Sequence, residues 1–179
     1  MKSYTIHLIR HGVCEGNLEG RYIGRTQSPL AQEGIQALLE LKRKGIYPEA
    51  KKYYASPCVR CVDTLKVLYP TADPEVILEL AECDFGDWEN KKAEELKNDP
   101  KFVAWMNGGQ PEAPPNGESS IVFRQRVCAG FEMLVKNMMM TGDESAVLVT
   151  HGGVIMTILA AYGLPRPKMT DWMCGNGHG

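Results

Sequence analysis

Residues 6 to 12 read Ile-His-Leu-Ile-Arg-His-Gly, and this stretch decides the fold of the chain. The run from residue 3 to residue 10 is short, apolar and partly β-branched, which is typical of a buried strand in a parallel sheet. Gly12 closes the run, so we expect the strand to end at Arg10. Arg10 and His11 therefore stand where the chain leaves the sheet, and we take this junction as the candidate reaction centre.

A second histidine stands in the same position on another predicted strand. Residues 146 to 149 are apolar and β-branched, and the sequence Thr150-His151-Gly152-Gly153 leads from them into an apolar helix. The strand that ends at Arg10 and the strand that ends before His151 thus each deliver a histidine at the carboxyl end.

Two further strand ends supply an arginine and a carboxylate. A strand over residues 53 to 55 precedes Ser56-Pro57, which predicts a helix N-cap followed by proline at the first helical position. Arg60 then falls in the first turn of that helix. The apolar run Val76 to Leu80 predicts another strand, and Glu82 follows it.

The alternation of strands and helices predicts an α/β fold with a mostly parallel sheet. The remaining predicted elements are a helix from Ser28-Pro29 to Gly45, a polar helix over residues 91 to 105, a loop rich in Pro and Gly from Asn107 to Gly117, and a long helix that begins at Glu118-Ser119-Ser120.

In open α/β sheets, ligands bind outside the carboxyl ends of the strands. The predicted strand ends gather His11 and His151, Arg10 and Arg60, and the single carboxylate Glu82. This group is positive overall, so it suits a dianionic phosphate ester. Phosphoryl transfer needs an in-line nucleophile, cations on the equatorial oxygens and an acid for the departing alkoxide. A neutral imidazole serves as that nucleophile if a hydrogen bond holds its other nitrogen.

The sequence holds no Walker loop, no Asp-x-Asp pair and no zinc-type cluster of His and Cys, so we expect no metal and no cofactor. Cys58 and Cys61 form a C-x-x-C pair, but no second pair of ligands is spaced to complete a zinc site. We interpret these two residues as packed thiols.

Composition restricts the class of protein and its partners. The chain has 179 residues, which suits a single domain over residues 1 to 179, and its formal net charge is −2. No run of Lys and Arg indicates a nucleic acid or a membrane surface as a partner, and no apolar run approaches the roughly 20 residues that span a bilayer. Six scattered cysteines without a secretion signal favour reduced thiols and a cytoplasmic location. Oligomeric state does not follow from these features.

Ordered motifs across most of the chain resemble those of the histidine phosphatase superfamily, also called phosphoglycerate mutase-like. The matching residues are Leu8-Ile9-Arg10-His11-Gly12, Asn17, Arg21, Gly24, Ser28-Pro29-Leu30, Ala55-Ser56-Pro57 with Arg60 and Thr64, Glu82 through Phe85-Gly86 to Trp88-Glu89, Gly117-Glu118-Ser119, and Val149-Thr150-His151-Gly152-Gly153.

The resemblance implies a three-layer α/β/α sandwich with helices on both faces of the sheet. It implies that His11 becomes phosphorylated and that Glu82 is the proton donor. It also implies that Arg10, Arg60 and His151 hold the phosphoryl group and that Asn17 contacts phosphate. The matched motifs add three expected substrate-binding residues, which are Arg21, Gly24 and Glu118.

Three features depart from the family pattern. Gln27 stands where the family often has Asp, and Asn90 stands where Gly usually follows Trp-Glu. The family also has a further strand after the region near Gly175, so we expect that edge strand to be missing here.

Within the family we favour a phosphatase over a mutase. Cofactor-dependent phosphoglycerate mutases resemble this chain but carry a larger, more basic insertion after the Glu82 position. The segment here, Asn90 to Asn116, is compact and resembles that of the phosphatase branch, including α-ribazole phosphatase-like members. The alternatives are a mutase and a noncatalytic phosphate-binding module, and Glu82 argues against the latter because binding alone needs no acid. The expected partner is a small phosphomonoester.

Overall fold

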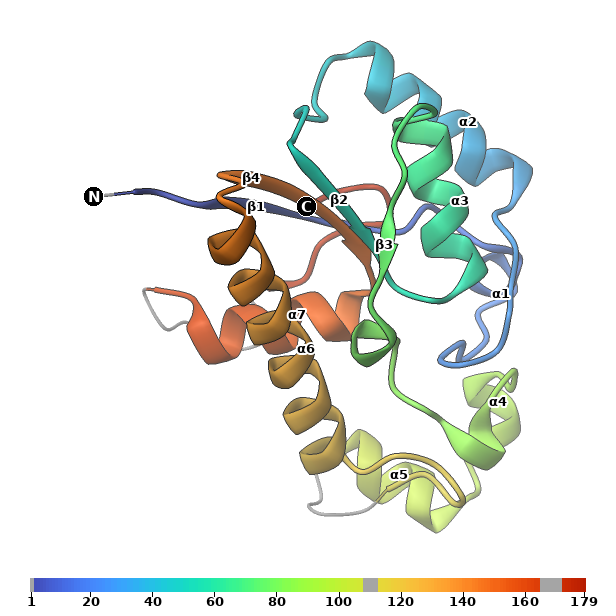
Figure 1. Ribbon diagram of the computed structural model, residues 1–179. Coiled ribbons are helices and arrows are strands. Elements are labelled where there is room, and N and C mark those ends of the chain that lie inside the picture. Colours follow the sequence, from blue (N-terminus) through green and yellow to red (C-terminus); the bar gives the residue numbers. More distant parts are fainter. Residues whose placement is uncertain (1, 108–112, 165–171) are drawn as a thin grey trace.

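The computed structural model describes residues 2–107, 113–164 and 172–179, and within them four strands form one parallel sheet in the order β1-β4-β2-β3 (Figure 1). The strands are β1 (Thr5–Arg10), β2 (Lys52–Ala55), β3 (Glu75–Val76) and β4 (Ser145–Thr150). In the pairing of β1 with β4, Arg10 lies beside Thr150. The two histidines that follow these strands therefore leave the sheet at neighbouring points.

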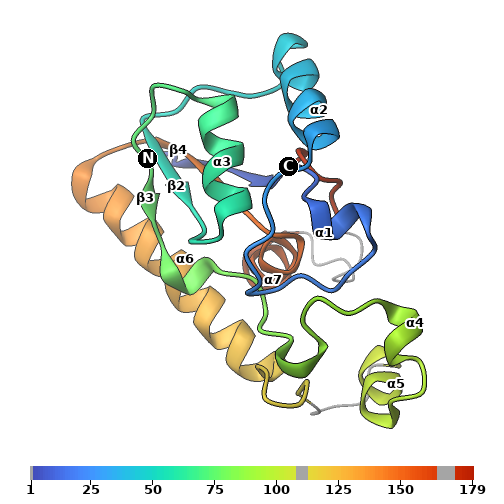
Figure 2. The same ribbon diagram turned by 90° about the vertical axis from the view of Figure 1, so that its right-hand side faces the viewer.

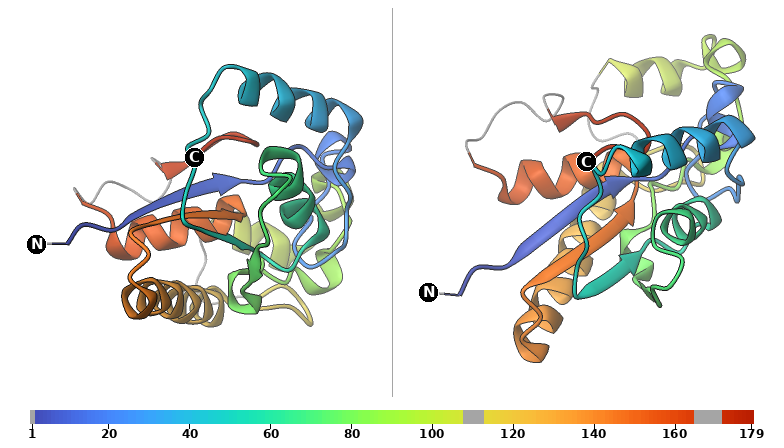
Figure 3. Two further views of the ribbon diagram at one scale, coloured as in Figure 1. Left: turned by 45° about the horizontal axis from the view of Figure 1, so that its top comes forward. Right: turned by 90° about the horizontal axis from the view of Figure 1, so that it is seen from above.

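Helices cover both faces of the sheet, as predicted (Figure 3). α2 and α3 pack on one face, and α6 and α7 pack on the other. The helices are α1 (Glu15–Leu18), α2 (Gln32–Arg43), α3 (Val59–Leu68), α4 (Ala93–Leu96), α5 (Pro100–Met106), α6 (Ser120–Thr141) and α7 (Gly152–Tyr162). The α/β class and its sandwich of helix, sheet and helix layers are confirmed.

The central strand β4 supplies both hydrophobic cores. Successive residues of a strand face opposite sides of the sheet. Val147 and Val149 therefore pack with α2 and α3, whereas Ala146 and Leu148 pack with α6 and α7. All four side chains are fully buried, so the strand that leads into His151 is held from both faces.

The predicted polar helix over residues 91 to 105 is two short helices, α4 and α5. Asp99 accepts the Lys101 backbone N–H as an N-cap, and Pro100 begins α5, so the Asp-Pro pair divides the segment. An aromatic cluster of Trp88, Phe102, Tyr22, Phe85 and Trp105 packs these helices against the neighbouring loops, and the unit projects from the rest of the fold (Figure 2).

The predicted strand from Val76 to Leu80 is shorter than expected. β3 stops at Val76, and a 3-10 helix over Leu78–Leu80 follows. The Leu80 carbonyl accepts the Thr150 hydroxyl at 3.0 Å, which fixes the turned chain against β4. Glu82 therefore follows a helical turn and not a strand end directly.

Two predicted helix starts were wrong. α2 begins at Gln32, and Ser28 instead accepts the Gly16 backbone N–H at 3.0 Å. α3 begins at Val59 with Cys58 as its N-cap, so Ser56-Pro57 lies before the helix. The other boundaries were close: Ser119 caps α6 through the Val122 N–H, and Gly45 follows α2 at a φ of 70°.

One prediction falls partly outside the described residues, because the loop from Asn107 to Gly117 includes residues 108–112.

The family's further strand after the region near Gly175 was expected to be missing, and the described residues 172–179 contain no strand. Instead, Arg10 of β1 donates its N–H to the His178 carbonyl, and its carbonyl accepts the Gly177 N–H, both at 2.9 Å. Among the described helices, none combines the length and apolar character needed to cross a bilayer.

Candidate active site

His11 carries an unprotonated nitrogen, Nε2, on the side of its ring that faces Arg60. Its Nδ1 lies 2.7 Å from the Gly12 carbonyl oxygen, which only accepts hydrogen bonds, so Nδ1 carries the proton and Nε2 does not. Burial, with the positive charges of Arg60 and Arg10, lowers the pKa of His11 to about 3. The imidazole is therefore neutral at physiological pH, and Nε2 is the candidate nucleophile.

Arg60 from the first turn of α3 lies directly against this nitrogen. Its side chain is fully buried, and its Nε donates to Nε2 of His11 at 3.3 Å. Nη1 and Nη2 donate to the carbonyls of Thr26 at 3.0 Å and Gly24 at 2.7 Å. The guanidinium is thus fixed, and any group bonded to Nε2 of His11 lies within its reach.

His151 extends the same network behind His11. Its Nδ1 accepts from Nη2 of Arg60 at 3.2 Å, and its Nε2 lies 2.6 Å from the Ser56 hydroxyl oxygen. Burial, with the charge of Arg60, holds the pKa of His151 well below its usual value. In the neutral ring Nδ1 is the acceptor, so Nε2–H donates to Ser56. The two imidazole centroids lie 5.3 Å apart.

Glu82 is held by backbone amides on both carboxylate oxygens. Oε1 accepts from the Cys83 N–H at 3.0 Å, and Oε2 accepts from the Gly153 N–H in the first turn of α7 at 3.1 Å. A β-carbon on Gly153 would lie 2.5 Å from Oε1, so only glycine permits this approach. Burial raises the pKa of Glu82, which favours the protonated form that a general acid requires.

A cavity of about 160 Å³ opens beside these groups. Its lining consists of Arg10, His11, Asn17, Ile23, Glu82, Gly152, Gly153, Met156, Met173 and Cys174. Arg10 donates through Nη1 to the Cys174 carbonyl, but its buried Nε has no hydrogen-bond partner among the described residues. A buried donor without a partner is costly, and an anion in the cavity would satisfy it.

Asn17 is also expected to contact phosphate, and it lines this cavity. Its Oδ1 accepts from the Cys14 backbone N–H at 3.3 Å and from Nδ2 of Asn176 at 3.4 Å. The Nδ2 amide group of Asn17 is a hydrogen-bond donor and can therefore bind an anion in the cavity. Asn17, Arg10, His11 and Glu82 thus meet at one cavity, with Arg60 and His151 buried behind it.

The other expected substrate-binding residues do not line the cavity. Arg21 pairs with Glu19 and donates to the Asn90 carbonyl. Gly24 contributes its carbonyl to Arg60, and a β-carbon there would lie 1.9 Å from the Cys83 carbonyl oxygen. Glycine is required at this position for packing of the loop.

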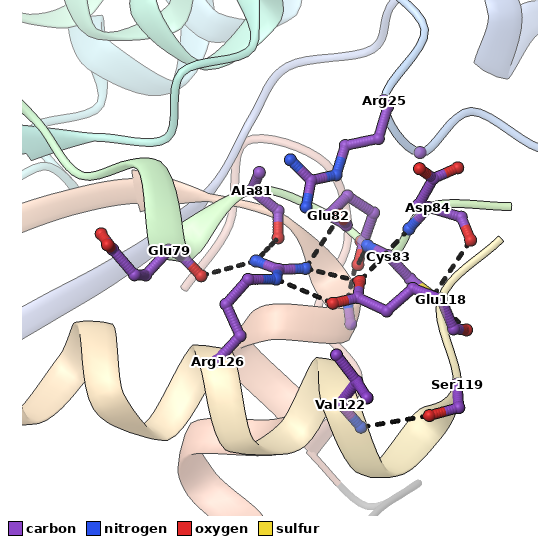
Figure 4. Close-up of polar contacts among 12 residues, drawn as sticks. Arg25, Glu79, Ala81, Glu82, Cys83, Asp84, Glu118, Ser119, Val122 and Arg126 are labelled. Carbon is purple, nitrogen blue, oxygen red and sulfur yellow. Dashed lines mark hydrogen bonds and ion pairs between the residues drawn. The ribbon is translucent and has the colours of Figure 1, made fainter. Parts of the chain in front are cut away.

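Glu118 also lies away from the cavity lining. Its carboxylate forms an ion pair with Arg126 of α6, beside the segment that carries Glu82 (Figure 4). The structure thus brings Glu118 near the backbone of the proposed acid and gives it no place at the phosphate.

Sequence reasoning gave Ser56 only the role of a helix N-cap and gave Thr64 and Glu89 no role, although all three fall within the matched motifs. Thr64 accepts the Gly12 N–H at 2.9 Å and donates to the Arg60 carbonyl at 2.6 Å, so it joins the loop after His11 to α3. Glu89 accepts backbone N–H groups of residues 24 to 26. That loop in turn supplies the carbonyls that hold Arg60.

Gln27 and Asn90, which depart from the family pattern, each fit the local structure. Gln27 accepts the Val59 N–H at 2.9 Å and so caps α3, the helix that carries Arg60. Asn90 has a φ of 61°, in the left-handed region that Asn tolerates better than most residues other than Gly. Neither residue lines the cavity.

In the described part of the chain, no three His, Cys, Asp or Glu side chains gather as metal ligands would. Cys58 and Cys61 are free thiols in the core, in keeping with their interpretation as packed residues.

The fold and the site define a class: an α/β sandwich that gathers a neutral histidine, two arginines and a buried carboxyl group at one edge of its parallel sheet. Residues 6–178 match the histidine phosphatase superfamily (branch 1), and the chain belongs to this family.

Its relatives include phosphatases and mutases. The adenosylcobalamin/alpha-ribazole phosphatase of Salmonella typhimurium (strain LT2) is 29% identical over 92% of this chain and 82% of its own length. The 2,3-bisphosphoglycerate-dependent phosphoglycerate mutase of Rhizobium etli is 27% identical, covering 93% of this chain and 83% of its own. The crystal structure of the alpha-ribazole phosphatase from Shigella flexneri superposes with a TM-score of 0.82 at 27% identity, covering 96% of this chain and 86% of that one.

Proposed function

We propose that this protein is a metal-independent phosphomonoester hydrolase that works through a phosphohistidine on His11. One observation supports the proposal: the Gly12 carbonyl binds Nδ1–H of His11, so Nε2 is unprotonated, and Nε of Arg60 donates to Nε2 at 3.3 Å. A nucleophile needs a lone pair, and the phosphoryl group it receives needs nearby positive charge. When the substrate binds, the Arg60 N–H turns from Nε2 to a phosphoryl oxygen, and the lone pair is released for attack.

In the first step, Nε2 of His11 forms a bond to phosphorus while the bond from phosphorus to the ester oxygen breaks. Arg10, Arg60 and Asn17 bind the nonbridging oxygens. Glu82 transfers its proton to the departing oxygen, so the alcohol leaves neutral and a carboxylate remains.

In the second step, a water oxygen attacks phosphorus, and the electron pair of the nitrogen–phosphorus bond returns to Nε2 of His11. The Glu82 carboxylate accepts the proton of the water, which restores the acid and releases inorganic phosphate. His151 acts on the phosphoryl group through Arg60, because its Nδ1 accepts a hydrogen bond from Nη2 of Arg60 and holds the guanidinium.

For the substrate we propose an ester of an uncharged alcohol, with α-ribazole phosphate as the first candidate. The names of the Salmonella and Shigella relatives support that choice. The cavity lining supports it too: beside the phosphate ligands it contains the apolar side chains Ile23, Met156 and Met173, and Arg10 is its only cation among the described residues. A second phosphate or a carboxylate would find little charge there.

We also propose a cytoplasmic location, because all six cysteines are free thiols. The proposed partner is the small phosphomonoester itself.

The test of the proposed function is a panel of phosphomonoesters that includes α-ribazole phosphate and 3-phosphoglycerate. Phosphate release and isomerised product are both measured, and the enzyme is trapped during turnover to detect an acid-labile phosphoenzyme. We expect phosphate release and a phosphoenzyme that His11→Ala abolishes. His7→Asn is the matched control, since His7 lies in β1 outside the cavity lining and should retain the phosphoenzyme.

Other outcomes separate the alternatives. Interconversion of phosphoglycerates that requires a bisphosphate activator would indicate a mutase. Anion binding without turnover of any ester would indicate a binding module. A phosphoenzyme that persists in His11→Ala would exclude His11 as the nucleophile.

A further inference from the structure

We infer that Arg126 and Glu118 are positioning residues that hold the backbone around Glu82. The inference rests on the proposed role of Glu82 as proton donor. Neither residue lines the cavity, so the inference assigns a role that the mechanism above does not include.

The guanidinium of Arg126 reaches from α6 to the segment that carries the acid (Figure 4). Nη1 donates to the carbonyls of Glu79 at 2.6 Å and Ala81 at 3.0 Å, and Nη2 donates to the carbonyl of Glu82 itself at 3.3 Å. One side chain thus binds three backbone carbonyls within four consecutive residues. Arg126 thus supports the turn before the acid from α6, while the Thr150 hydroxyl holds the Leu80 carbonyl from β4.

Glu118 fixes that support from the other side. Its carboxylate accepts Nε of Arg126 at 2.9 Å and Nη2 at 2.7 Å, a bidentate pair in which both side chains are largely buried. Its backbone N–H donates to the Asp84 carbonyl at 2.9 Å. Glu118 therefore holds both the guanidinium and the chain just after Glu82.

Packing against an aromatic ring completes the arrangement. The Phe123 side chain is buried, and the guanidinium carbon of Arg126 lies 5.3 Å from its ring centroid. Carboxylate, carbonyls and ring leave the guanidinium little freedom to rotate. A lysine at this position carries the same charge, but it cannot form the fork that binds Glu118 and three carbonyls together.

The Glu82 carboxylate and the Glu82 main chain are bound by two different helices, so the position of the carboxyl group depends on both. Oε2 of Glu82 is bound to the Gly153 N–H in α7, whereas its main chain is held by α6 through Arg126. Loss of the Arg126 contacts would leave the carboxyl group attached to α7 with its backbone free to shift. A displacement of about 1 Å in a reacting group costs on the order of 100-fold in rate.

Leaving-group dependence is the readout that separates positioning of the acid from general damage. Esters with poor leaving groups, such as alkyl phosphates, need a proton on the departing oxygen, whereas 4-nitrophenyl phosphate does not. We expect Arg126→Lys and Glu118→Gln to lower kcat on alkyl phosphates by about 10- to 100-fold and to change kcat on 4-nitrophenyl phosphate by less than about 3-fold. Arg124→Lys is the control, because Arg124 is exposed on the same helix.

Glu82→Gln measured on the same panel distinguishes failure of the inference from failure of the proposed function. If Glu82→Gln lowered kcat equally on both ester types, Glu82 would not be the proton donor, and the inference would fail with that assignment. A selective loss in Glu82→Gln, with equal or no losses in Arg126→Lys and Glu118→Gln, would overturn the positioning role alone. Thermal unfolding of each variant shows whether equal losses come from unfolded protein.

Discussion

The hydroxyl oxygen of Ser56 lies 2.6 Å from Nε2 of His151, and both side chains are fully buried. This contact determines which ring nitrogen of His151 carries the proton. With its proton on Nε2 and directed at Ser56, the ring offers the Nδ1 lone pair to Arg60. Ser56 therefore helps to fix the guanidinium that lies against the nucleophile.

Removal of this hydroxyl should reduce both stability and catalysis. In Ser56→Ala the buried Nε2–H of His151 loses its oxygen acceptor and keeps only the weaker Cys61 sulfur at 3.5 Å, which costs about 1–3 kcal/mol of unfolding free energy. If Arg60 is also less well held, we expect kcat to fall about 10-fold. Urea denaturation and steady-state kinetics measure the two effects.

Ser28→Ala provides the comparison for that prediction. Ser28 is also buried, and its hydroxyl accepts a backbone N–H from Gly16 outside the histidine network. We expect it to lose stability with little change in kcat. If kcat fell equally in Ser56→Ala and Ser28→Ala, the Ser56 hydroxyl would contribute to packing and not specifically to catalysis.

The sequence misled us about Ser56 for a physical reason. A serine before Pro at a helix start is typical of an N-cap, and local propensity contains no information about a histidine 95 residues away. In the folded chain Cys58 takes the cap position, and the α3 amide of Val59 is satisfied by Gln27. Tertiary hydrogen bonds thus replaced the local cap.

Where the prediction was right, it rested on sheet geometry. Parallel strands place their carboxyl ends at one edge, so the chain segments after β1 and β4 had to bring His11 and His151 together. Arg60 followed from its place in the first turn of α3. The position of Arg126 could not be predicted, because it depends on where α6 crosses the turn at Leu78–Leu80, which the sequence indicated as a strand.

The pH dependence of catalysis should identify the acid. Burial raises the pKa of Glu82, and an acid acts only while protonated, so its contribution should vanish as pH rises through that pKa. We expect the ratio of kcat/KM for wild type over Glu82→Gln on an alkyl phosphate to be large at low pH and to fall at high pH. Ionisation of the substrate cancels in this ratio. A ratio independent of pH would contradict proton donation by Glu82.

Folding stability should fall in acid because His11 is buried in its neutral form. Its pKa is about 3 in the folded protein against 6.5 for the ordinary side chain, so between these values the unfolded chain binds more protons. Stability is therefore complete above pH 6.5 and is lost as pH falls toward 3, by up to about 1.4 kcal/mol per pH unit. Urea denaturation at successive pH values should give a shallower slope for His11→Gln than for wild type. Parallel slopes would mean that the ring is solvated.

Arg10 should dominate the binding of inorganic phosphate, because its buried Nε has no partner among the described residues. A hydrogen bond to a charged group contributes about 1.5–3 kcal/mol, so Arg10→Gln should weaken phosphate binding by about 10- to 100-fold. In wild type, phosphate at 100 times its Kd should raise the unfolding free energy by about 2.7 kcal/mol. Calorimetric titration and thermal unfolding with phosphate measure both effects, and Arg43→Gln on the exposed side of α2 should bind as wild type does. Undiminished phosphate binding by Arg10→Gln would place the anion elsewhere and would require a different explanation for the unpartnered nitrogen.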